Sequence, residues 1–174
     1  MKYLVKLFVI TFFLLFSTYA FSEQKIVVLD LKYVLNLSKA GKGAQDYLKK
    51  TYKKNNKKYT EIEKALKKEE QDLLTKKTVL SKEEYTKKSD SLRKKVIDYQ
   101  SQRRASIDKL ATQRAESRDI LIKSINPIVE TYIKENNISF VIDKKNTLAG
   151  NPESDITKVI VEKLNKILPS LNLK

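Results

Sequence analysis

The sequence contains neither cysteine nor histidine. It can therefore form no disulfide, and it lacks the thiol and imidazole groups that serve most often as nucleophile, general base or metal ligand. Serine, lysine, aspartate and tyrosine are present, but no spacing typical of a nucleophile and its base occurs among them. We therefore expect a protein that is not an enzyme and that needs neither a cofactor nor a metal ion.

Glycine and proline are also scarce, with three residues of each, whereas charged residues make up 33% of the chain. This composition favours long helices over an all-β fold. The pair Gly41-Lys42 is reminiscent of a phosphate loop, but the earlier glycine of that motif and the Ser or Thr after its lysine are missing. Small residues that allow close packing at the start of a long helix are the better interpretation. The sequence thus predicts a protein that works without ATP.

The first 22 residues have the pattern of an export signal. Lys2 and Lys6 supply a positive start, and a mostly apolar run follows over residues 7–16. Because a membrane-spanning helix needs roughly 20 apolar residues, an uncleaved anchor is the less favoured alternative. Ala20 and Ser22 have the spacing of a cleavage site before Glu23. The pattern predicts that the mature chain leaves the cytoplasm.

Two long segments in the middle of the chain have apolar or weakly polar residues at alternating steps of four and three. This 3.5-residue repeat keeps one stripe of a helix facing a partner helix. The rhythm stops over residues 75–81, where Ser81 and Glu84 have the spacing of a capping box that begins the second helix. The stripe positions are Leu48, Tyr52, Asn55, Tyr59, Ile62, Leu66, Glu69 and Leu73 in the first segment and Tyr85, Ser89, Leu92, Val96, Tyr99, Arg103, Ser106 and Leu110 in the second.

The two stripes match when the helices are paired antiparallel. Partners then have numbers that sum to 158, so that most polar stripe positions face polar or wettable ones. This symmetry about Val79 predicts a helical hairpin within one chain, and two separate surface helices are the alternative. The predicted partners include Leu66 with Leu92, Tyr59 with Tyr99, Asn55 with Arg103, and Tyr52 with Ser106 as the loosest match.

The remaining segments predict a small body with short strands. Lys25–Asp30 and Ile138–Asp143 are apolar, β-branched runs, and the first is expected to be buried on both faces. A short helix is predicted over Leu31–Leu37. A third strand is predicted over Asn146–Ala149.

The second long helix extends past the hairpin into an apolar region that should pack into the body. Pro127 lies within it and predicts either a kink or a new helix start. Asn136-Asn137 should end this helix, because asparagine tolerates the left-handed conformation. A final helix, capped by Ser154 or Asp155, carries apolar residues at helical spacing: Ile156, Val159, Ile160, Leu164 and Ile167.

The sequence therefore predicts a mainly α protein with a small β body (α+β). Residues 1–22 form the signal peptide, residues 23–43 with 114–174 form the body, and residues 44–113 form the long antiparallel coiled-coil hairpin, called the arm below. The body is small for an independent core, and short strands leave open sheet edges. Both features predict an oligomer whose strands join across subunits.

The arm region is strongly basic. Residues 39–109 hold 22 lysines and arginines against 11 acidic residues, an excess of +11. Such a surface favours acidic partners: nucleic acid, anionic lipid surfaces or acidic polypeptides. Because the chain carries an export signal, we expect no nucleic acid partner.

The segments at the two chain ends resemble the Skp/OmpH family of periplasmic chaperones. The resemblance rests on Lys25-Ile-Val-Val-Leu-Asp30, Val34-Leu-Asn-Leu-Ser-Lys-Ala-Gly-Lys42, Pro127-Ile128, Ile138-Ser-Phe-Val-Ile-Asp143, Asp155-Ile-Thr157 and Leu164-Asn165. It implies a periplasmic homotrimer whose strands form a shared β-barrel, with three arms that enclose a cavity. It also implies unfolded outer-membrane proteins as clients, and for one subgroup a lipopolysaccharide site.

The residues support the same mechanism. Basic arms would attract acidic stretches of an unfolded chain, and many weak apolar and tyrosine contacts would then hold it. The alternative is a structural or surface protein that binds anionic lipid or lipopolysaccharide through the arm. For any single lysine, a solvated helix face is the simpler interpretation. The candidate client-binding residues are Tyr47, Lys53, Lys54, Lys57, Lys58, Lys76, Lys77, Lys87, Lys88, Lys94 and Lys95.

Overall fold

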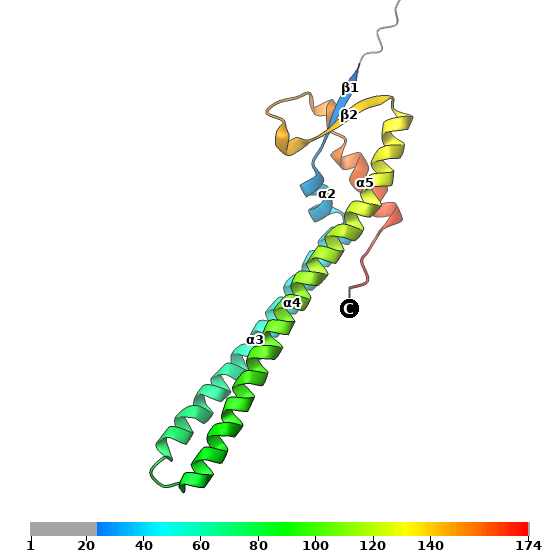
Figure 1. Cartoon of the computed structure of the whole chain (residues 1–174). Coiled ribbons are helices and arrows are strands. Elements are labelled where there is room, and N and C mark those ends of the chain that lie inside the picture. Colours follow the sequence, from blue (N-terminus) through cyan, green and yellow to red (C-terminus); the bar gives the residue numbers. More distant parts are fainter. Residues whose placement is uncertain (1–23, 174) are drawn as a thin grey trace, which may run out of the picture.

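The structure is a computed structural model that describes residues 24–173 (Figure 1). The signal peptide predicted over residues 1–22 lies outside the described residues. No helix within the described part is long and apolar enough to cross a membrane. The elements are β1 (Lys25–Leu29), α2 (Leu31–Leu37), α3 (Lys39–Thr75), α4 (Lys82–Glu135), β2 (Ile138–Asp143), the 3-10 turns η1 (Lys144–Asn146) and η2 (Pro152–Ser154), and α5 (Thr157–Ile167).

Helices α3 and α4 lie side by side as a long hairpin that projects from a small body (Figure 1). The predicted hairpin is therefore confirmed. All predicted stripe positions are buried or half-buried except Tyr52 and Arg103, which are exposed. Such a pair of helices is held together mainly by the burial of the apolar stripe of each helix against the other.

The side-chain contacts between the two helices differ from the predicted pairing in detail. Tyr59 and Tyr99 face each other as predicted, with ring centroids 6.2 Å apart. The Asn55 amide, however, donates to Ser106 Oγ at 2.8 Å, whereas its predicted partner Arg103 donates to the Tyr99 hydroxyl at 3.3 Å. Helical side chains lean toward the N-terminus of their own helix, so in an antiparallel pair each reaches past the residue directly opposite. This lean explains why the observed partner is one stripe position farther along α4.

The capping box predicted at Ser81 is present. Ser81 Oγ accepts the amide hydrogen of Glu84 at 3.2 Å, and the Glu84 carboxylate accepts the Ser81 amide at 3.1 Å. The hydrogen bonds from Ser81 lower the pKa of the Glu84 carboxyl. The box satisfies backbone donors that the first turn of α4 would otherwise leave free.

Replacing Ser81 with alanine should therefore fray the start of α4. We expect Ser81→Ala to lower the free energy of unfolding by about 0.5–2 kcal/mol, the usual effect of losing such a cap. Amide hydrogen exchange should accelerate at residues 82–85. The control is Ser91→Ala, an exposed position in the same helix. Equal effects of the two variants would contradict a capping role.

The body is built on a parallel pair, β1 with β2, packed against α2, α5 and the last part of α4. Val34, Ile160 and Leu164 are completely buried at its centre. The predicted strand over Asn146–Ala149 is wrong. The Asp143 carboxylate accepts the amide of Lys145 at 3.2 Å, and this bond turns the chain into η1 directly after β2.

A different segment continues the sheet beside β1. Asp155 forms an isolated parallel bridge with Val28, and the Ile156 amide donates to the Val28 carbonyl at 3.0 Å. The predicted cap of the last helix is confirmed only in part. Ile156 holds the N-cap position without a side-chain bond, while the Asp155 carboxylate accepts the amide of Thr157, the first helical residue, at 2.9 Å.

Asp155 also fixes the position of the loop after β2. Its carboxylate forms an ion pair with Lys144 Nζ at 2.6 Å. Partial burial opposes ionisation of this carboxyl, but the bonds from Lys144 and Thr157 outweigh it and lower the pKa of Asp155. Thr157 in turn accepts the amide of Asp30 at 2.8 Å, which ties the start of α5 to the start of α2.

Helix α4 runs through Pro127 as one helix, so of the two predicted alternatives, a kink or a new helix start, the new start is wrong. The helix ends where predicted. Asn136 is its C-cap, and Asn137 has a positive φ of 50°, the left-handed conformation that asparagine tolerates.

One face of the sheet remains open to solvent in the single chain. Phe140 is 59% exposed, and Ile26 and Ile142 are also exposed. The predicted burial of β1 on both faces is therefore wrong for one chain alone. Val27 and Leu29 face the core, whereas the other side of the strand lacks a covering layer.

Candidate client-binding surface of the arm

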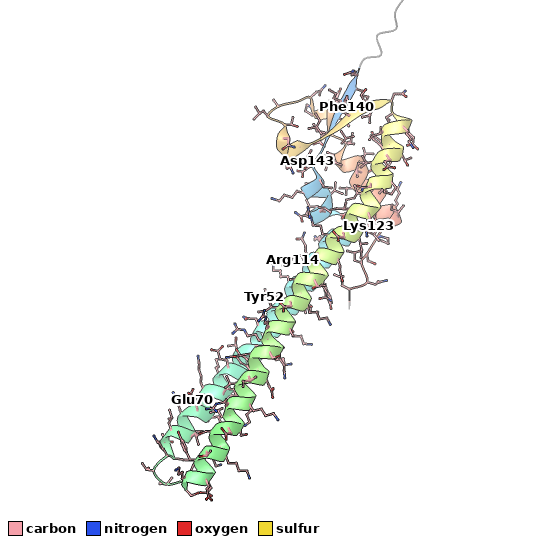
Figure 2. All side chains as sticks on the ribbon, in the orientation of Figure 1. Tyr52, Glu70, Arg114, Lys123, Phe140 and Asp143 are labelled. Atoms are coloured by element: carbon pink, nitrogen blue, oxygen red, sulfur yellow. The ribbon has the colours of Figure 1, made fainter. Side chains whose placement is uncertain are left out.

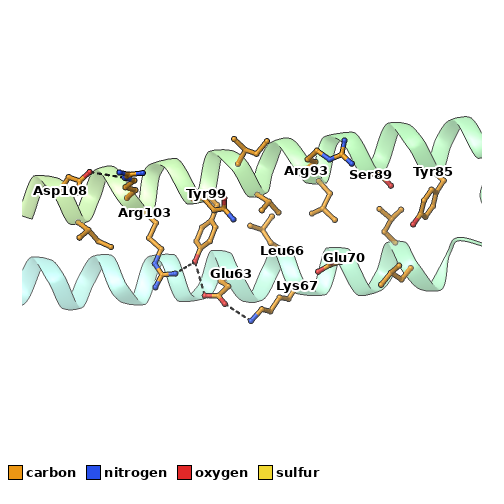
Figure 3. Close-up of a pocket in the computed structure, with 18 residues that line it drawn as sticks. Glu63, Leu66, Lys67, Glu70, Tyr85, Ser89, Arg93, Tyr99, Arg103 and Asp108 are labelled. Atoms are coloured by element: carbon orange, nitrogen blue, oxygen red, sulfur yellow. Dashed lines mark hydrogen bonds and ion pairs between the residues drawn. The ribbon is translucent and has the colours of Figure 1, made fainter.

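A long groove runs between α3 and α4, lined by α3 residues from Glu63 outward to Leu74 and by α4 residues from Tyr85 to Asp108 (Figure 3). Its volume is about 840 Å³. Stripe residues of both helices line it, including Leu66 and Leu73 from α3 and Leu92 and Val96 from α4. The groove therefore exposes part of the apolar contact between the helices.

The rim of the groove adds large apolar side chains that face solvent. Leu74, Ile97 and Ile107 are all more than half exposed, at 58%, 58% and 54%. Each directly follows a stripe position in the sequence, which places all three on one flank of the hairpin. The positions directly before the stripe hold only polar, small or charged residues and the half-buried Tyr47. Only one flank of the arm thus presents large aliphatic surface.

Charged side chains on the rim are bound to one another (Figure 3). Tyr99 donates its hydroxyl hydrogen to Glu63 at 3.2 Å and accepts from Arg103 at 3.3 Å. Glu63 also pairs with Lys67 at 2.9 Å. The bond with Lys67 lowers the pKa of Glu63, and the same bond raises the pKa of Lys67. Both groups are therefore ionised at neutral pH, and the rim carries both signs of charge.

The predicted client-binding lysines do not line this groove. All ten are exposed, and Tyr47 is half-buried. Lys95 forms an ion pair with Glu69 at 2.6 Å, and Lys58 lies over the Tyr59 ring, 5.4 Å from its centroid. The structure does not gather the lysines into one site, and their role in client binding stays a prediction.

The basic excess is concentrated in the half of the arm near the body. Residues 61–98 hold 11 basic and 9 acidic residues. Residues 47–60, in contrast, hold six lysines and no acidic residue. These six lysines form three adjacent pairs that recur every four residues along α3, and all are exposed. The positive field of the arm is thus strongest near its root and weak toward its tip.

A second hollow lies at this root, where the arm joins the body. Its volume is about 1130 Å³, and α3, α4, α2 and the end of β2 all contribute to it. Tyr52 and Arg114, both part of its lining, lie on the arm between Glu70 and the body (Figure 2). The arm therefore offers an apolar groove along its length and a charged hollow at its root.

The comparisons with known proteins agree with this architecture. Residues 25–164 match the family described as outer membrane protein (OmpH-like). The chain belongs to the OmpH-like family. The match covers the entire arm and most of both parts of the body, so the resemblance predicted from the short end motifs is confirmed.

A crystal structure with a similar fold is that of a proposed outer membrane chaperone (OmpH-like) from Caulobacter crescentus. It has a TM-score of 0.79 and 18% sequence identity, and the alignment covers 91% of this chain and 94% of that one. No curated protein matches the sequence. The long hairpin on a small body is therefore shared with another OmpH-like protein despite low sequence identity.

Proposed function

We propose that this OmpH-like protein is an ATP-independent periplasmic holdase chaperone that binds unfolded outer-membrane proteins and prevents their aggregation. The observation that carries the proposal is the arm itself. It projects from the body, it is basic, and it exposes Leu74, Ile97 and Ile107 beside a groove. Exposed apolar surface on an exported protein is a feature of binding sites. Family membership and the chaperone description of the Caulobacter protein support the same role.

The proposal includes a homotrimer with a shared, barrel-like body and three arms around a cavity. The support is the unfinished sheet: two strands of one chain leave Ile26, Phe140 and Ile142 exposed on one face. A two-stranded sheet is marginal alone and gains stability when further strands or a covering layer are added. Copies of the same chain can supply that layer, and several arms then act on one client by multivalency.

The proposal is tested with the mature chain and an unfolded outer-membrane β-barrel protein diluted out of urea. Light scattering should show suppressed aggregation without ATP. Client capture should slow by about tenfold or more between 0.01 and 1 M salt, because salt screens the attraction between basic arms and acidic client segments. Undiminished aggregation at every salt concentration would refute the holdase function. Salt-independent capture would refute its electrostatic part.

Binding of anionic lipid or lipopolysaccharide is the second candidate function. The run of six lysines without an acidic residue over residues 47–60 is the feature that favours it. Vesicles with and without anionic lipid, added to the same aggregation assay, separate the two functions. Lipid capture without any suppression of aggregation would favour the surface-binding function.

A further inference from the structure

The groove between α3 and α4 and the hollow at the root open on the same flank of the arm. Arg114, in the root hollow, is one heptad after Ile107 on the groove rim. Arg118 is two heptads after Arg104, and Lys49 is two heptads before Glu63. Residues at multiples of seven lie on the same side of a coiled-coil helix. One surface therefore runs along the arm from tip to root.

The chemistry of this surface changes along its length. The outer part exposes aliphatic side chains, whereas the root hollow is lined by six basic and three acidic residues. Of the acidic residues, Asp143 pairs with Lys145 at 3.3 Å, and Asp30 accepts the amide of Tyr33 at 2.7 Å. The third, Asp46, offsets one further positive charge, so that the hollow keeps a net charge of +3. Lys144 is paired with Asp155, outside the hollow.

The other four basic side chains of the hollow have no ion pair within the part of the chain that the structure describes. They are Lys32, Lys49, Arg114 and Arg118. These four side chains can therefore bind an anionic ligand. Two of them are arginines one helical turn apart on α4, and the planar guanidinium group of arginine binds a carboxylate through two parallel hydrogen bonds. The root hollow is thus complementary to acidic side chains, and the outer groove to apolar ones.

We propose that this flank binds a single extended polypeptide segment in two parts, with apolar side chains in the outer groove and a carboxylate-rich stretch in the root hollow. The inference rests on the proposed function and names the client feature that the arm selects. Ile97 and Arg118 are 21 residues apart in α4, or about 32 Å at 1.5 Å per residue. An extended chain covers that distance in about ten residues. Ile107, also on the groove rim, is only seven residues, or about 10 Å, before Arg114. The preferred client segment therefore has its apolar and acidic parts about three to ten residues apart, with the longer spacing for a segment that reaches Ile97 and Arg118.

The test uses the mature full-length protein and fluorescent peptides. One peptide joins an apolar block to an acidic block through a spacer of about ten residues, a second joins the blocks directly, and two others carry one block each. We expect the spaced peptide to bind at least tenfold more tightly than any other, because the second block then binds at high effective concentration. Equal affinity of the spaced and directly joined peptides would overturn the proposal.

Two pairs of variants locate the binding surface. Ile97→Asn should weaken the spaced peptide about tenfold and leave the acidic block unaffected, whereas Val79→Asn at the exposed tip should change neither. The double variant Arg114→Gln/Arg118→Gln should weaken the spaced peptide by a similar factor and abolish most of its salt dependence.

The control for the arginines is Lys50→Gln/Lys109→Gln, which removes the same charge from exposed positions of the arm outside both hollows. An equal loss in this control would show that only the overall field matters and would overturn the proposal. The aggregation assay keeps the two claims separate. A wild-type protein that suppresses aggregation but shows no dependence on peptide spacing refutes the two-part site and leaves the holdase function standing.

Discussion

Replacing Gly41 with alanine should destabilise the protein strongly. Gly41 lies in the first turn of α3, and a Cβ atom added there would lie 2.0 Å from the carbonyl oxygen of Leu35 and 2.9 Å from its carbonyl carbon. Both are backbone atoms of α2, so no side-chain rotation can relieve the clash. The two helices must separate, and overpacking of this kind lowers the free energy of unfolding by about 1–3 kcal/mol or more.

Gly43 provides a matched control in the same helix. A Cβ atom at Gly43 would meet nothing within 4 Å. Alanine is the better helix former by about 1 kcal/mol, so Gly43→Ala should stabilise the protein by up to that amount. Urea unfolding followed by circular dichroism measures both variants. Gly41→Ala as stable as the wild type would contradict the close contact between α2 and α3.

The arm was predictable from sequence because its helices, their ends and their buried sides are determined by residues close together in the chain. The alternation of four and three over Leu48–Leu73 and Tyr85–Leu110 specifies which side of each helix is buried. The capping box at Ser81 and the left-handed Asn137 are likewise determined within a few residues. Tyr52 and Arg103 deviate because the stripe predicts which side faces the partner but not how side chains lean across the interface.

The errors in the body have a different origin. Residues 146–149 have a strand-like composition, but the backbone of β1 instead bonds to Asp155 and Ile156 on its free edge. These two residues are far from β1 in the sequence. Which segment pairs with β1 depends on tertiary contacts, and the β-propensity of a segment does not predict those contacts. The apolar groove was not predicted, because the basic excess of the arm favoured its lysines as candidate binding residues. The signal was present: Leu74, Ile97 and Ile107 each stand directly after a stripe position on the same flank.

Replacing Ile160 with alanine should have the largest effect on the body. Ile160 lies in α5 and is completely buried in a core cluster to which β1, α2, α4 and β2 all contribute. Truncation of a buried isoleucine to alanine lowers the free energy of unfolding by about 2–5 kcal/mol, since the removed atoms leave a cavity. This is a large part of the 5–15 kcal/mol that is typical of a folded domain.

The segments that lose hydrogen-exchange protection in Ile160→Ala distinguish local packing of the body from a loss of stability throughout the chain. Amides of β1, β2 and α5 should lose hydrogen-exchange protection, whereas those near Leu66 and Leu92 should lose less, because the stripe of the arm is buried independently of α5. Ile167→Ala, at a position in the same helix that is 61% exposed, should change the free energy by about 0.5 kcal/mol or less. Equal loss of protection in the arm and body would instead mean that α5 supports the whole chain, and that the arm cannot stay folded when the small core beneath it opens.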